Sequence, residues 1–153
     1  MDVWRICKKK HAATAFDGIG AEIAGSRWNF KGHKVVYTSS TLTLAKLEVF
    51  VHLTGNTAPD DLVYIKAIIP NDVSREDINL SHLPAHWMDH PARDATKSIG
   101  SNWVERGKTL IFSVPSAITP EEHNILINPS HAEFNRITID KPAPLRFDRR
   151  MWK

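Results

Sequence analysis

Arg27, Tyr37 and Glu48 are three chemically versatile side chains that lie in one stretch, between Gly25 and His52. Each stands in apolar or glycine-bearing surroundings, at the end or on the face of a short predicted element. A guanidinium is a strong ligand for anions, and a carboxylate held away from water can stabilise a positive charge. The stretch therefore predicts a binding or catalytic site.

The direction of Glu48 depends on a helix predicted over residues 42–52. Apolar side chains recur there at three- and four-residue steps and fill most of the circumference, which is typical of a helix packed on more than one side. Ser39–Thr41 supply capping side chains before it, and Gly55–Asn56 is expected to end it. With Leu44 one turn before it, Glu48 is predicted to leave the helix on a partly buried face.

An unpaired charge on such a face costs several kcal/mol, on the order of that for ions moved into protein interiors. Glu48 must therefore have a partner in the fold or a function. A structural interpretation stays open, in which Glu48 forms a salt bridge or hydrogen bond, for example to His52 or to an arginine.

Two further side chains are candidates because of their positions. Arg5 lies between Trp4 and Ile6 in the first predicted strand, where it either faces solvent or reaches along a cleft as an anion ligand. Ser116 follows the predicted strand 110–114, at a point where side chains often enter a cleft. Ser116 can equally form a turn by bonding to its own backbone.

The remaining elements form one domain over residues 1–153. A polar turn at 31–34 is expected between two short strands, and residues 12–24 are expected to form a loop with a short helical turn. Residues 71–93 read as a surface segment broken by prolines, and residues 142–153 as a basic tail held by Leu145, Phe147 and Trp152. Strands are predicted at 3–6, 35–38, 62–69, 110–114 and 137–139, and a second helix at 95–104.

Composition excludes several classes of protein. Hydrophobic residues make up 42% of the 153 residues and charged residues 24%, as in ordinary globular domains. No apolar run approaches a membrane span, and no signal-peptide core follows Met1. The single cysteine, Cys7, cannot form an internal disulfide, so a cytoplasmic location is expected.

Nucleic acid and metal are not expected as direct ligands. The net charge is only +3, and basic residues are not interleaved with aromatic ones on one element. His82, His86 and His90 have helix-like spacing, but Pro84 interrupts the run and no further ligands complete a metal site.

In order along the chain, these features resemble the RES domain family over nearly its whole length. Each is weak alone, but their combination and spacing are specific. The matching pieces are Val3-Trp4-Arg5, Gly25-Ser26-Arg27-Trp28-Asn29, Val36-Tyr37, Leu47-Glu48 with His52, Ile99-Gly100 with Trp103, Val114-Pro115-Ser116-Ala117, Asn124, Asn128-Pro129 and His131.

The resemblance implies an α+β fold, similar to ADP-ribosyltransferases, with a split or mixed β-sheet and flanking helices. It implies the toxin of a bacterial toxin–antitoxin pair that degrades NAD by cleaving the bond between nicotinamide and ribose. The acceptor would be inorganic phosphate or water, and no cofactor besides these substrates is implied. The implied partner is an Xre-type antitoxin that blocks the cleft, and a homodimer within a larger complex stays open.

The same resemblance suggests a role for each candidate residue. Arg27, with Arg5, would hold the pyrophosphate of NAD, and Glu48 would stabilise positive charge on the ribose. Tyr37 would stack on or enclose the nicotinamide ring, and Ser116 would donate to a phosphate or ribose oxygen. Two alternatives remain at this stage: a transferase that moves ADP-ribose onto a protein, and a non-catalytic nucleotide-binding module.

Overall fold

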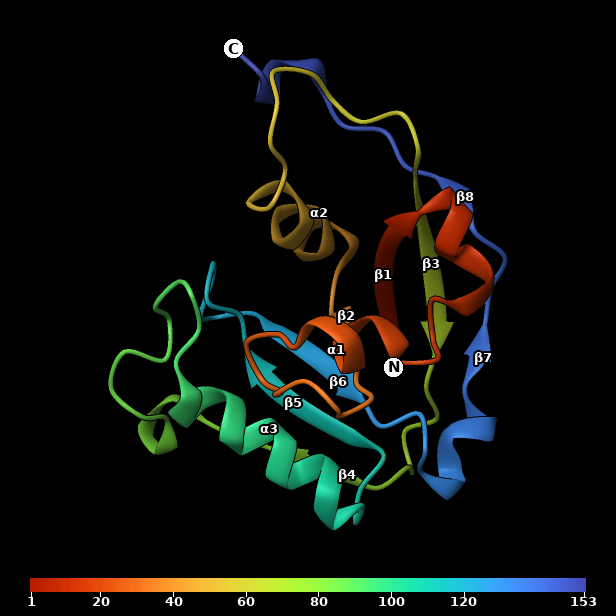
Figure 1. Cartoon of the computed structure of the whole chain (residues 1–153). Coiled ribbons are helices and arrows are strands. Elements are labelled where there is room, and N and C mark those ends of the chain that lie inside the picture. The colour runs from red at the N-terminus through yellow and green to blue at the C-terminus, as the bar shows by residue number, and fades with distance from the viewer.

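The computed structural model describes residues 1–153, which form one mixed β-sheet with helices packed against it (Figure 1). The sheet has the order β4-β5-β6-β2-β1-β3-β7, with β8 also paired to β3. Every pair is antiparallel except β4 with β5. The α+β class is thereby confirmed. The strands are β1 Asp2–Lys8, β2 Val36–Ser39, β3 Leu62–Ile68, β4 Arg75–Asp77, β5 Ile111–Pro115, β6 His123–Ile127, β7 Thr138–Ile139 and β8 Ala143–Pro144.

Three α-helices complete the fold: α1 Ile19–Ala24, α2 Leu42–Phe50 and α3 Asp94–Arg106. The expected cap of α2 is present, because the Thr41 side chain accepts a hydrogen bond from the backbone N–H of Leu44 at 3.0 Å. Gly107 ends α3 in the left-handed conformation, with φ of 59°. No helix is both long enough and apolar enough to cross a membrane.

Helices α2 and α3 pack against the same face of the sheet, over different strands. Side chains alternate between the two faces of a strand, and register places Tyr37 opposite Leu126 in β6. Leu126 belongs to the cluster of Trp28 and Trp103, with which α3 packs, while α2 packs on β1 and β2. The central strands β2 and β6 therefore present one face between the two helices.

The largest apolar core fills the opposite face. Val3, Val36, Ile65, Ile125 and Ile127 alternate with the residues of the helix-bearing face and are 0–2% exposed. A third, smaller cluster joins α2 to the C-terminal tail. Leu145 and Phe147 are buried there and Trp152 packs against them, so the predicted anchoring of the tail is confirmed.

Four details of the sequence prediction need correction. The strand expected before the turn at 31–34 is wrong, because only a single bridge joins Ser26 to Asn29. Helix α2 ends at Phe50 rather than at Gly55–Asn56. Residues 9–24 contain a 3-10 helix and α1, more helix than one turn. Strands β4, β6 and β8 were not predicted as strands; the sequence of β4, Arg-Glu-Asp, has the charged character of an exposed sheet edge.

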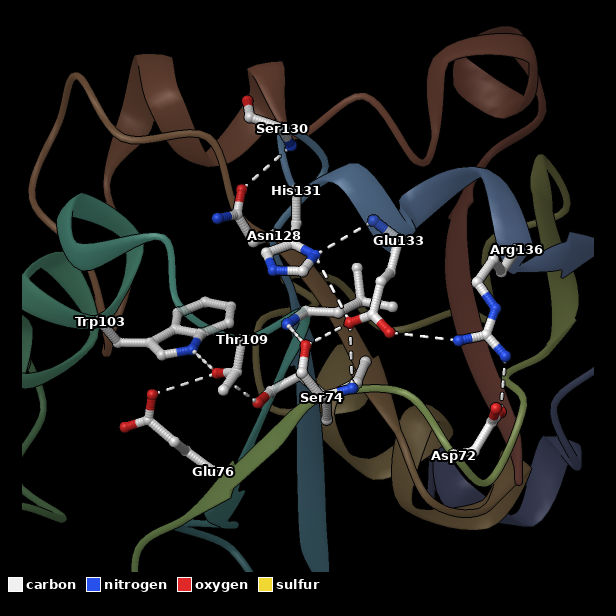
Figure 2. Close-up of polar contacts among 12 residues, drawn as sticks. Asp72, Ser74, Glu76, Trp103, Thr109, Asn128, Ser130, His131, Glu133 and Arg136 are labelled. Atoms are coloured by element: carbon white, nitrogen blue, oxygen red, sulfur yellow. Dashed lines mark hydrogen bonds and ion pairs between the residues drawn. The ribbon is translucent and has the colours of Figure 1, made fainter.

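A polar network fixes the loop after β6 to the segment that precedes β4 (Figure 2). Both the backbone N–H and the hydroxyl of Ser74 donate to Oε2 of Glu133, in the 3-10 helix Ala132–Arg136. Arg136 donates to Oε1 of the same carboxylate at 3.2 Å and to Asp72 at 2.6 Å. We call Ser74, Glu133 and Arg136 the Glu133 network.

Candidate active site

A cleft of about 590 Å³ opens on the helix-bearing face of the sheet. Its size lies within the range of small-molecule sites. Polar side chains reach it from five parts of the chain, among them Glu48 from α2, Tyr37 from β2, Asn124 from β6, Lys97 from α3 and Arg27 from the loop after α1, and Ser26, His52 and His90 also line it. The structure thus brings together Arg27, Tyr37 and Glu48, three residues singled out from the sequence.

Glu48 is half-buried and is held through only one of its oxygens. Oε1 accepts hydrogen bonds from the Ser116 hydroxyl at 2.8 Å and from the Asn124 amide Nδ2 at 2.6 Å. No protein group donates to Oε2. The carboxylate therefore has the fold partners that the structural interpretation required, yet keeps one oxygen for a ligand.

Ser116 lies behind Glu48 and is fully buried. Its oxygen accepts from the backbone N–H groups of Ile118 and Thr119, at 3.0 and 3.2 Å, so the turn fixes the hydroxyl. Its single proton is donated to Glu48. The turn-forming interpretation of Ser116 is therefore confirmed, whereas Ser116 does not line the cleft itself and contacts it only through Glu48.

Arg27 joins the cleft to the loop that precedes α3. Its Nη1 donates to the backbone oxygens of Trp87 and Asp89, at 2.7 and 2.9 Å. Burial lowers the pKa of Arg27, and the nearby carboxylates of Glu48 and Asp89 oppose that shift. Because an arginine stays protonated in proteins, the cleft holds a fixed cation whose Nε and Nη2 have no hydrogen-bond partner within the protein.

Tyr37 presents a neutral, immobilised ring to the cleft. Its hydroxyl donates to Oδ1 of Asn29 at 2.6 Å and accepts from the backbone N–H of Trp28 at 3.2 Å. Burial raises the pKa of the phenol, so Tyr37 does not ionise at neutral pH. The hydroxyl is thereby occupied within the fold, and the ring is the part available to a ligand.

Arg5 is not brought to the cleft. Arg5 lies on the same face of β1 as Val3, which belongs to the core on the far side of the sheet. The cleft face of β1 carries Trp4 instead, because Trp4 pairs with Ser39, which is on the same face of β2 as Tyr37. From behind the sheet, Nη1 of Arg5 donates to the backbone oxygen of Tyr37 at 2.9 Å, and burial lowers the Arg5 pKa.

Three residues near the cleft were given no role from the sequence, although Asn124 and Gly100 are among the pieces that resemble the RES family. Asn124 donates a hydrogen bond to Glu48, and Lys97 lines the cleft from α3. Gly100 allows α3 to pack closely against the backbone of Trp28, the residue after Arg27. A Cβ at position 100 would lie 1.9 Å from the Trp28 carbonyl oxygen. Asn124 is a polar residue that directly precedes the apolar run Ile125–Ile127, and this position could have indicated a side chain that faces a site.

A family model described as RES domain matches residues 2–148. The chain belongs to the RES domain family. The RES domain covers nearly the entire chain, in agreement with the motif order along the sequence.

Full-length relatives are consistent with this assignment. "Toxin Res" of Yersinia enterocolitica is 34% identical and aligns over 99% of both chains. "Prs ADP-ribosylating toxin" of a Sphingobium strain is 37% identical, over 97% of this chain and 94% of its own. "Toxin Res" of Photorhabdus laumondii is 33% identical, over 100% of this chain and 98% of its own.

A solved structure has the same fold. The Mycobacterium tuberculosis MbcT–MbcA toxin–antitoxin complex matches 99% of this RES chain and 86% of the solved chain, with a TM-score of 0.75 and 13% identity. At that identity the match concerns the fold alone, which agrees with the single α+β domain described above.

Proposed function

We propose that this RES protein is the toxin of a toxin–antitoxin pair and that it degrades NAD by cleaving the nicotinamide–ribose bond. The observation that carries the proposal is the half-paired Glu48 carboxylate, which faces a cleft that also holds the Arg27 cation. The names of the full-length relatives, toxins in each case, support the biological role.

The reaction needs a fixed negative charge beside the ribose. As the C1′–N bond breaks, its electron pair leaves with nicotinamide, which becomes neutral, and the ribose takes up positive charge. An oxygen of inorganic phosphate or of water then bonds to C1′, its proton is released to solvent, and the product is ADP-ribose, phosphorylated or free. Oε2 of Glu48 stabilises the cationic ribose and accepts a hydrogen bond from a ribose hydroxyl, because Oε1 is already bonded to the fold.

The other cleft residues bind the substrate. Arg27 holds the pyrophosphate through Nε and Nη2, since Nη1 is occupied by two backbone carbonyls. The Tyr37 ring packs against nicotinamide with its hydroxyl fixed. Ser116 takes part through Glu48, and Arg5 through the backbone of Tyr37.

The test is to incubate the purified protein with NAD, with and without inorganic phosphate, and to follow nicotinamide release and the ribose product by phosphorus NMR. Phosphate-dependent release would identify a phosphorylase, and phosphate-independent release a glycohydrolase. Glu48→Gln should abolish most of the release, while Glu121→Gln, an exposed glutamate outside the cleft, serves as the matched control. Folded protein that releases no nicotinamide in either buffer would contradict the proposal.

Transfer of ADP-ribose to a protein is the second candidate, because one relative is named as an ADP-ribosylating toxin. The donor half of the reaction would use the same cleft, and only the acceptor would differ. Biotin-labelled NAD incubated with cell extract distinguishes the two. Label on a protein, lost with Glu48→Gln, would favour the transferase, whereas label only on small molecules would exclude it.

The proposed partner is an Xre-type antitoxin that closes the cleft, and the fold match to a toxin of a toxin–antitoxin complex supports it. The cationic Arg27 favours an inhibiting segment that carries an acidic side chain or a terminal carboxylate. Arg27→Ala should weaken binding of the cognate antitoxin by about tenfold, measured by calorimetry. An unchanged Kd would show that the segment does not use this cation.

A further inference from the structure

Glu48 is held by a chain of two side chains from paired neighbouring strands, β2 and β6. The Ser39 hydroxyl, on β2, donates to Oδ1 of Asn124 at 2.7 Å, and Nδ2 of Asn124, on β6, donates to Oε1 of Glu48 at 2.6 Å. Ser39 is 4% exposed and does not line the cleft, whereas Asn124 does.

The direction of the Asn124 amide follows from this order. An amide has an acceptor oxygen on one side and a donor NH₂ on the other, and only the donor stabilises a carboxylate. Because Ser39 supplies its proton to the amide oxygen, the NH₂ group is turned toward Glu48. Without that hydroxyl, the amide could rotate and place its oxygen against the carboxylate.

The two donors to Glu48 also determine which oxygen faces the ligand. Asn124 and Ser116 both bond to Oε1, from β6 and from the turn after β5. A carboxylate anchored at one oxygen by two elements has little rotational freedom, so the unpaired Oε2 has a fixed position.

We propose that Ser39 and Asn124 are positioning residues that orient the Glu48 carboxylate for catalysis. The proposal rests on the proposed function only for its kinetic consequence, since the hydrogen-bond chain is a property of the fold. Neither residue is expected to react with the substrate. Each acts on the reaction only by orienting the Glu48 carboxylate.

Kinetics of nicotinamide release test the consequence. Asn124→Leu keeps the size of the side chain but removes the donor, and should lower kcat by about 10- to 100-fold with little change in KM. Ser39→Ala should lower kcat less, and should have no further effect once Asn124→Leu is present. In a Glu48→Gln background, Asn124→Leu should also have no further effect, which a merely structural residue would not show.

An NMR measurement tests the chain independently of any reaction. The side-chain amide signals of Asn124, assigned by their loss in Asn124→Leu, should shift on Glu48→Gln and on Ser39→Ala in folded protein. Amide signals that do not respond to either change would overturn the proposal. Independent, multiplicative losses of kcat for Ser39→Ala and Asn124→Leu would also overturn it. If the wild-type protein releases no nicotinamide, the proposed function fails and the NMR result alone decides whether the chain orients Glu48.

Discussion

Two glutamates in this molecule accept hydrogen bonds from a serine hydroxyl, yet their surroundings differ in what they leave free. In the Glu133 network, Ser74 bonds to Oε2 and Arg136 to Oε1, so both oxygens are occupied and an arginine is in contact (Figure 2). At Glu48 both donors go to Oε1, and no cation forms an ion pair with the carboxylate. The first arrangement neutralises a charge, and the second keeps it available.

The number of carboxylate oxygens that the fold occupies separates Glu133 from Glu48, whereas burial does not, because both residues are half-buried. A structural acid gains most when every lone pair has a donor. A catalytic acid must keep its charge for the transition state, so the fold orients it through one oxygen only.

The largest expected effect comes from exchanging each glutamate for glutamine. Glu48→Gln removes the charge that faces the cleft and, on the proposed function, should lower kcat by about 100- to 1,000-fold while cooperative unfolding persists. Glu133→Gln should leave kcat unchanged and lower the Tm, because Arg136 and Ser74 lose an ionic acceptor. Nicotinamide release and thermal unfolding measure both. Equal kinetic damage from the two variants, with intact folds, would remove the distinction.

A second prediction concerns the rigidity of the cleft, which depends on the close approach of α3 to Trp28. In Gly100→Ala the new Cβ would lie 1.9 Å from the Trp28 carbonyl oxygen, so α3 or the loop that carries Arg27 must move. We expect a loss of about 1–3 kcal/mol in unfolding free energy and a raised KM for NAD.

Gly20→Ala is the matched control for Gly100→Ala, since no atom lies within 4 Å of the added Cβ. Urea unfolding and NAD kinetics of both variants test whether close packing, rather than glycine content, matters. Equal stability of Gly100→Ala and the wild type would contradict the packing at this contact.

The third prediction compares the arginines of the two regions. Arg27→Lys replaces a planar fork by a single ammonium group, so the Nη1 contacts to Trp87 and Asp89 are lost, and with them the proposed bidentate binding of the substrate's pyrophosphate. KM for NAD should rise by about tenfold. Arg136→Lys, which is 39% exposed at its side chain, should change neither KM nor kcat. A KM that rises equally in both variants would place the effect outside the cleft.

Much of the fold could be predicted because local signals are strong. Thr41 caps α2 as expected, and Gly107 ends α3. Strand β4 lacked such a signal, since three consecutive charged residues do not alternate with apolar ones. Helix α2 was predicted too long because the apolar pattern continues to Val51, which is exposed at the cleft rather than packed in a core.

The candidate site could be predicted only in part, because its geometry depends on register. Arg27, Tyr37 and Glu48 stand close in sequence and meet in the cleft. Asn124, 76 residues from Glu48, joins them only through the pairing of β2 with β6. Both faces of β1 are covered by apolar clusters, so its sequence does not alternate between polar and apolar residues. The face on which Arg5 lies could therefore not be predicted.

The smallest expected effect is the contribution of Glu133 to the pH dependence of stability, which the comparison with Glu133→Gln isolates. Hydrogen bonds from the Ser74 side chain and backbone, together with nearby His131 and Arg136, hold the pKa of Glu133 below its ordinary value of 4.5. A carboxyl whose pKa is depressed in the folded state contributes stability above the unfolded pKa and loses it as the pH falls through the folded pKa. The Tm difference between the wild type and Glu133→Gln should therefore be full near neutral pH and shrink below about pH 4.5. A difference that stays constant down to acid pH would mean that the charge of Glu133 contributes nothing to the stability of the fold.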